Sequence, residues 1–175
     1  IPYVFIDTNQ HCFELFDSFK TVLAKNPIET IIIGGAFNTD FASKHKNERY
    51  YKKGNERVPL YKNRGKELSK KSFYNFVSDL SKKYNVVVLL DSPQDKRFDP
   101  GSMLSNGKRR LIPLGKSYTS KFPQDDYQIK ETDEMKEKLL GMKVSVADPR
   151  NLICPNNTCS PISVGGKPIY KDAEH

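Results

Sequence analysis

The sequence lacks any hydrophobic run that is long enough to cross a membrane. Its longest apolar stretches, residues 31–33 and 86–90, fall far short of the roughly 18 residues that a membrane-spanning helix needs. It also has no basic-then-apolar signal region and no internal repeat. With 175 residues, 37% of them hydrophobic and 11% aromatic, the chain is expected to fold as one domain. Because it starts at Ile1 and not at Met, we expect it to be a fragment.

Cysteine and histidine are scarce, with three of each. The histidines are scattered at His11, His45 and His175. A zinc site needs four ligands and a second close pair, which this distribution does not supply, so no metal is expected. Cys154 and Cys159 flank Pro-Asn-Asn-Thr, a turn-forming spacer that can bring their sulfurs together. We expect a local disulfide, and hence an oxidising, extracytoplasmic compartment, with Cys12 free or paired upstream.

Acidic residues are few in one part of the chain. The net charge of +8 comes from 29 Lys and Arg against 21 Asp and Glu, and residues 43–71 hold eleven of the basic residues but three of the acidic ones. Residues 43–65 have no sustained period and are expected to form a long surface loop. No nucleic-acid-binding fold signature accompanies the charge, so no nucleic acid is expected as a partner. A solvated loop and a contact with anionic lipid or acidic glycan both remain open.

Helical and strand-like patterns alternate along the chain. Apolar spacing predicts helices over residues 8–25, 68–84 and 129–140, and short apolar strands over 30–34, 86–90 and 143–147. This alternation is typical of a mainly parallel sheet covered on both faces, so the fold class is α/β. Residues 91–126 show no regular element. Because ligands bind beyond the carboxyl ends of such strands, a site is expected after Ile33, Leu90 or Val146.

Two short motifs follow predicted strands. In D-A-E-H, Asp172 precedes His175 by three residues, so its carboxylate can hold one imidazole nitrogen while the other acts as a base. A solvated helix start capped by Asp172 is the alternative. In G-G-A-F-N, the glycines allow close approach of the backbone, and the Asn38 amide could donate to a developing oxyanion. A plain turn at the end of the strand is the alternative there.

A resemblance to a known family rests on two runs within residues 139–175. They are L-L-G-M-K-V-S-V-A-D-P-R-N-L-I-C-P-N-N-T-C and G-G-K-P-I-Y-K-D-A-E-H. Together they resemble the end of the SGNH domain fused to membrane acyltransferase-type (acyltransferase family three) O-acetylases of bacterial surface polysaccharides. H-C-F-E-L-F-D-S-F-K, T-I-I-I-G-G-A-F-N and V-V-V-L-L-D-S-P match more loosely. The resemblance implies a three-layer α/β/α sandwich, with residues 1–175 as a single SGNH-like domain that lacks its N-terminal portion.

The resemblance also implies roles for individual residues. Asp172 matches the orienting acid and His175 the general base, while Cys154 and Cys159 match the family's cysteine pair. Asn38 matches the oxyanion-hole asparagine more loosely, because the family usually shows G-x-N-D and this chain has G-A-F-N. The family's nucleophilic serine stands in a G-D-S block that this sequence lacks, so we expect it upstream. The rival is the serine of L-L-D-S-P, Ser92, whose alternative role is a turn-capping hydroxyl.

The implied function is serine acyl transfer outside the cytoplasm. The resemblance points to an O-acetyltransferase or esterase acting on hydroxyls of a cell-surface polysaccharide such as lipopolysaccharide O-antigen. It implies no cofactor, a fused membrane acyltransferase domain as acyl donor, and a place on the periplasmic side of the bacterial inner membrane. The alternative is a non-catalytic binding module that docks on an anionic glycan or membrane surface through residues 43–71.

Overall fold

The computed structural model describes residues 3–6, 11–37, 41, 49–53, 56–103 and 121–171. The chain forms two compact units, and it passes between them three times. Unit 1 contains Ile1–Leu89 and Glu134–Ala147, and unit 2 contains Leu90–Asp133 and Asp148–His175. The prediction that the chain makes a single domain stays a prediction. Among the described residues, no helix combines the length and the apolar content needed to span a membrane.

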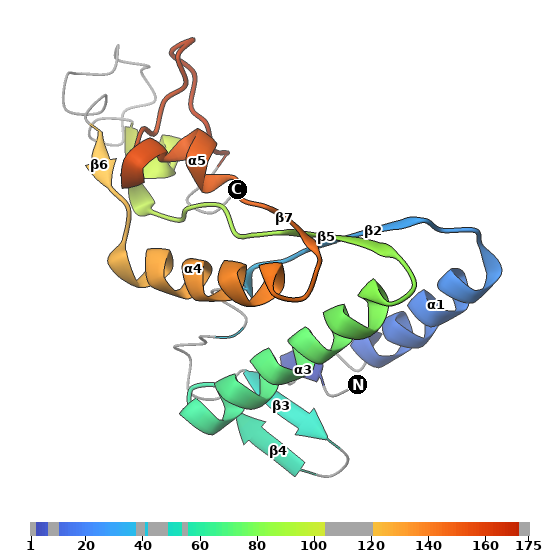
Figure 1. Cartoon of the computed structure of the whole chain (residues 1–175). Helices are drawn as coiled ribbons and strands as arrows, with labels where there is room; N and C mark the ends of the chain where they lie inside the picture. Colours follow the sequence, from blue (N-terminus) through green and yellow to red (C-terminus); the bar gives the residue numbers. More distant parts are fainter. Residues whose placement is uncertain are drawn as a thin grey trace. The chain divides into compact units, whose positions relative to one another are not determined.

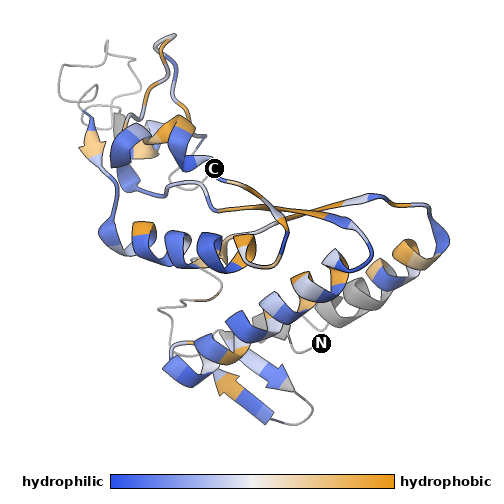
Figure 2. Ribbon diagram, in the orientation of Figure 1, coloured by the Kyte–Doolittle hydropathy of each residue, from blue (hydrophilic) through white to orange (hydrophobic). Residues whose placement is uncertain are grey.

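Unit 1 contains a three-stranded parallel sheet (Figure 1). Its strands, in spatial order, are β2 (Thr30–Gly34), β5 (Asn85–Leu89) and β7 (Ser145–Ala147). The register places Ile31 beside Val86 and Val88 beside Val146, so β-branched side chains meet along the sheet. Figure 2 shows the apolar character of β2 and β5. The prediction of an α/β fold with a parallel sheet is confirmed.

Three long helices lie where apolar side chains recur at helical spacing. They are α1 (His11–Lys25), α3 (Asn63–Ser81) and α4 (Asp126–Leu140). Helix α3 starts at Asn63, five residues before the predicted start at Leu68, because residues 63–67 contain no large apolar side chain that would reveal the period. Within unit 1, α3 packs against β5 of the parallel sheet and also against a second, antiparallel sheet.

That second sheet corrects the sequence prediction. Residues 43–65 were expected to form a loop, but β3 (Arg49–Lys53) and β4 (Glu56–Pro59) make a hairpin, and β3 also pairs with β1 (Tyr3–Ile6). The side chains of Tyr51, Val58 and Leu60 are buried, with Leu68 of α3 packed against them. Strands β3 and β4 have only five and four residues, and most of these residues are charged or polar. The few apolar residues are therefore too sparse to show the alternating pattern of a strand. The hairpin signal in the sequence was Gly54-Asn55, between the paired Lys53 and Glu56.

Gly65 lies where α3 begins against the end of β4. A Cβ atom built on it would overlap the carbonyl oxygen of Pro59, which belongs to the backbone and cannot rotate away. Alanine normally favours a helix over glycine by about 1 kcal/mol. Here we expect the opposite: Gly65→Ala lowers the free energy of unfolding by about 1–3 kcal/mol, because the strand and the helix must move apart.

Urea unfolding followed by circular dichroism measures this effect. The control is Asn75→Ala, at an exposed position in the middle of the same helix, which should be neutral or slightly stabilising. A Gly65→Ala variant that unfolds at a urea concentration equal to or above that of the unaltered chain would contradict the expected overlap.

Unit 2 consists of short elements around a small aromatic core. Besides the first part of α4, its described elements are η1 (Lys96–Phe98), η2 (Pro100–Met103), β6 (Phe122–Pro123), α5 (Arg150–Ile153), η4 (Pro155–Asn157) and β8 (Thr158–Cys159). Strands β6 and β8 pair in antiparallel fashion. The buried core consists of Phe98, Phe122, Cys154, Cys159 and Tyr170. The prediction that residues 91–126 hold no regular element is wrong in detail, because η1, η2 and β6 lie in this range. Elements of two to four residues are too short to show a period in the sequence.

Candidate active site

The three predicted site residues of the acyl-transfer chemistry lie outside the described residues. Asn38 directly follows the described Phe37, and Asp172 and His175 follow the described Lys171. Their roles therefore stay predictions. The structure does describe the chain that leads into D-A-E-H, and the segment that follows β5 in unit 2. The site is built up below from these two segments.

The segment after β5, residues 91–94, is buried and held by hydrogen bonds. Asp91 and Pro93 are buried, and Ser92 is half-buried. The backbone N–H of Gln94 donates to Oε1 of Gln128 at 3.2 Å, and Nε2 of Gln128 donates back to the carbonyl oxygen of Gln94 at 2.8 Å. These two reciprocal bonds fix residues 91–94 to the first turn of α4.

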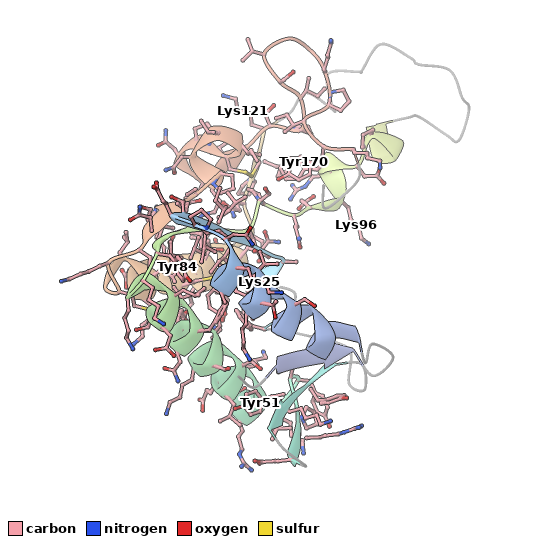
Figure 3. The ribbon with its side chains drawn as sticks, turned by 90° about the vertical axis from the view of Figure 1, so that its right-hand side faces the viewer. Lys25, Tyr51, Tyr84, Lys96, Lys121 and Tyr170 are labelled. Carbon is pink, nitrogen blue, oxygen red and sulfur yellow. A yellow bond between two sulfur atoms is a disulfide. The ribbon has the colours of Figure 1, made fainter. Side chains whose placement is uncertain are left out.

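Tyr170 joins the C-terminal segment to residues 91–94. Its hydroxyl donates to the carbonyl oxygen of Pro93 at 2.6 Å, and its side chain is 5% exposed. Its ring stacks on Phe98, with ring centroids 4.4 Å apart and planes at 22°. Figure 3 shows Tyr170 among the side chains of unit 2. Tyr170 precedes Asp172 by two residues, so the chain that enters D-A-E-H starts from a buried, fixed point.

The Tyr170 phenol is held in its protonated form. Burial is the larger influence and raises the pKa of Tyr170 above the ordinary value of 10.0, while a hydrogen bond with Ser92 works in the opposite direction. The phenol therefore remains a hydrogen-bond donor to Pro93 throughout the neutral range. Ser92, the rival nucleophile, takes part in this hydrogen bonding, which fits its alternative role as a turn hydroxyl.

A disulfide lies in the same core as Tyr170. The structure joins Cys154 to Cys159, five residues apart in sequence. Strand pairing places Cys159 opposite Phe122, whose ring meets Phe98 edge to face with centroids 5.2 Å apart. The disulfide, the aromatic rings and Tyr170 thus form one contiguous cluster. This cluster fixes the segment that leads into the D-A-E-H motif.

On the outer side of this cluster, a cation covers the Phe122 ring. The Arg97 guanidinium carbon lies 3.8 Å from the ring centroid, within the range of a cation–π contact. Its Nη2 and Nε atoms donate to the two carboxylate oxygens of Asp95, each at 2.7 Å. These side-chain hydrogen bonds are the main cause that holds the pKa of Asp95 below its ordinary value.

The segment after β7 carries a buried ion pair that sequence analysis did not single out. Arg150 is 8% exposed, and its Nε and Nη2 atoms donate to the two carboxylate oxygens of Asp148 at 2.9 and 2.7 Å. Nη2 also donates to Asp133 of α4 at 2.7 Å. The hydrogen bond with Asp148 is the main cause that raises the pKa of Arg150. The signal in the sequence was D-P-R directly after a strand, a spacing that allows a local bidentate pair.

Of the basic stretch, residues 43–71, the part that the structure describes lies on the hairpin, on the turn after it and on the first half of α3. The Arg57 guanidinium carbon lies 4.8 Å from the centroid of the Tyr50 ring, and Arg64 forms a 2.6 Å ion pair with Glu56. In the strand register Lys52 pairs with Arg57, so two cations face each other across the hairpin. Docking of an anionic glycan or membrane on residues 43–71 stays a prediction.

Comparison with known proteins agrees with this architecture. A family model described as the SGNH domain fused to AT3 domains matches residues 1–175, the whole sequence. No curated protein and no solved structure matches the sequence. An SGNH-type domain is a hydrolase or acyltransferase in general terms. The chain therefore belongs to the family of SGNH domains fused to AT3 domains, enzymes that transfer or hydrolyse acyl groups.

Proposed function

We propose that this domain transfers a small acyl group, most simply acetyl, to a hydroxyl of a cell-surface polysaccharide such as lipopolysaccharide O-antigen, or hydrolyses such an ester. The observation that carries the proposal is the family match over residues 1–175, which ends on the D-A-E-H motif. The fused AT3 domain would supply the acyl donor, and the polysaccharide is the acceptor.

The proposed reaction has two steps. A serine hydroxyl attacks the acyl carbonyl of the donor while His175 takes its proton and Asp172 holds the imidazolium in place. The amide of Asn38 donates to the oxyanion of the tetrahedral intermediate, which collapses to an acyl-serine as the leaving group receives the proton from His175. His175 then takes the proton of a sugar hydroxyl, whose oxygen attacks the acyl-serine. The new ester leaves, and the serine recovers its proton; water in place of the sugar gives hydrolysis.

The nucleophile in this proposal is a serine outside residues 1–175, in the G-D-S block that the sequence lacks. Ser92 is less favoured, because L-L-D-S-P lacks the glycine of the G-D-S block and a proline directly follows its serine. The disulfide between Cys154 and Cys159 supports a location on the periplasmic side of the bacterial inner membrane, where disulfides persist.

Fluorophosphonate labelling of the whole protein tests the proposal, with the labelled residue mapped by mass spectrometry. We expect a single labelled serine in the G-D-S block, and equal labelling of the Ser92→Ala variant. Labelling confined to Ser92 would move the nucleophile to the end of β5. The absence of labelling in a folded protein would contradict the serine mechanism and favour the binding-module alternative.

A further inference from the structure

A buried hydrogen bond joins two segments that lie far apart in the sequence. The Tyr170 hydroxyl and the Pro93 carbonyl oxygen lie 2.6 Å apart although their residues are 77 positions apart. Pro93 is among the most completely buried side chains, and Tyr170 is 5% exposed. A short hydrogen bond in such surroundings has little competition from water, so it holds its two segments at a fixed separation.

Both ends of this hydrogen bond are fixed independently. On one side, the reciprocal hydrogen bonds between Gln94 and Gln128 hold the residue next to Pro93. On the other side, the Tyr170 ring is stacked on Phe98, which itself packs against Phe122. Removal of the hydroxyl would therefore leave the ring in its place and release its connections to Pro93 and the neighbouring Ser92.

The hydrogen bond of Tyr170 lies close in sequence to the predicted catalytic residues. Asp172 follows two residues later and His175 five residues later. Two residues of extended chain span at most about 7 Å, so the backbone of the motif starts within that distance of Tyr170. A displacement of about 1 Å in a catalytic group is enough to cost about 100-fold in rate.

We propose that Tyr170 is a positioning residue, whose hydroxyl fixes the start of the D-A-E-H segment through Pro93 so that His175 meets the nucleophilic serine and the acyl donor. This inference rests on the proposed function, and it assigns a role to a residue that touches neither the substrate nor the reacting atoms. It predicts that the hydroxyl matters for the rate of acyl transfer and not for substrate binding.

The test compares Tyr170→Phe with the unaltered whole protein in hydrolysis of 4-nitrophenyl acetate. We expect kcat to fall about 10- to 100-fold while KM changes less than about twofold, because only the alignment of the catalytic groups is lost. The matched control is Tyr51→Phe, which removes the hydroxyl of another tyrosine that is 5% exposed, in unit 1, and should leave kcat unchanged. Near-ultraviolet circular dichroism at the assay temperature gives the folded fraction, to which each kcat is normalised.

Replacement of Tyr170 by 4-aminophenylalanine separates positioning from folding. This side chain keeps the ring and an N–H donor in place of the O–H, so it should restore kcat to within about threefold of the unaltered protein. Normal kcat in Tyr170→Phe, or an equal loss in the phenylalanine and aminophenylalanine variants, would overturn the inference. Failure of the proposed function is recognised separately, because His175→Ala would then retain full activity.

Discussion

In the whole protein, His175→Ala is expected to lower kcat for hydrolysis of 4-nitrophenyl acetate by at least about 10⁴-fold. Without the imidazole, no group takes the proton from the serine or returns it to the leaving alcohol. Asp172→Asn should cause a loss of similar order, because an amide favours the wrong imidazole tautomer and does not stabilise the imidazolium. Initial rates over a range of substrate concentrations separate this loss in kcat from a change in KM.

The matched control for this prediction is His45→Ala, which removes a histidine from the basic stretch and should leave kcat unchanged. Charge reversal at Lys52 and Lys53 serves as the opposing test. A protein that keeps its activity without His175 but loses its function when these two lysines become glutamates would be a binding module and not a serine enzyme. The acyl-transfer proposal predicts the reverse pattern.

Arg150→Ala is expected to lower the free energy of unfolding by about 3–5 kcal/mol. The Asp148 side chain is 5% exposed, so removal of the guanidinium takes two charge-assisted hydrogen bonds away from a buried carboxylate. The second partner contributes less, because the Asp133 side chain is 53% exposed and water screens its interaction with Arg150. Most of the expected loss therefore comes from Asp148.

Urea unfolding of Arg150→Ala, compared with Arg64→Ala, measures this difference between buried and exposed pairs. Arg64 and Glu56 form an equally direct ion pair, but their side chains are 72% and 49% exposed, so Arg64→Ala should cost less than about 1 kcal/mol. Arg150→Lys keeps the charge but loses the bidentate geometry, and it should fall between the two. Equal losses in Arg150→Ala and Arg64→Ala would show that burial of the Asp148 pair does not govern its contribution.

The parallel sheet and its helices could be predicted because their apolar patterns are long or continuous. The runs T-I-I-I-G and N-V-V-V-L form β2 and β5 almost residue for residue, because short continuous runs of β-branched residues favour strands. Their buried side chains are those of Ile31, Val86 and Val88, whereas Ile32 is 71% exposed. The helices extend over 15 to 19 residues, enough for the helical period to repeat several times.

The hairpin and the short elements of unit 2 could not be predicted from periodicity. In β3 the only buried side chain among those described is Tyr51, and β6 and β8 have two residues each. Their conformations depend on tertiary partners, such as the pairing of Phe122 with Cys159, which no local pattern encodes.

In the candidate site, too, some features could be predicted from the sequence and others could not. The D-A-E-H motif and the cysteine pair are local in sequence, so they could be identified from the chain alone. The contact between Tyr170 and Pro93 joins residues 77 positions apart, and the Arg150–Asp133 bond joins residues 17 apart. Such contacts follow from the fold and not from spacing, so only the structure reveals which residues hold the motif in place.

The order of strands in the parallel sheet has a consequence for synthesis of the chain on the ribosome. Strand β5 is the central strand, but its partner β7 begins at Ser145, more than fifty residues after Leu89. Until those residues emerge, the side of β5 that will receive β7 presents the backbone groups of an edge strand next to the apolar run Val86–Leu89. This stretch therefore needs protection by chaperones in the nascent chain, and a polypeptide cut short before Ser145 would keep that edge open to aggregation.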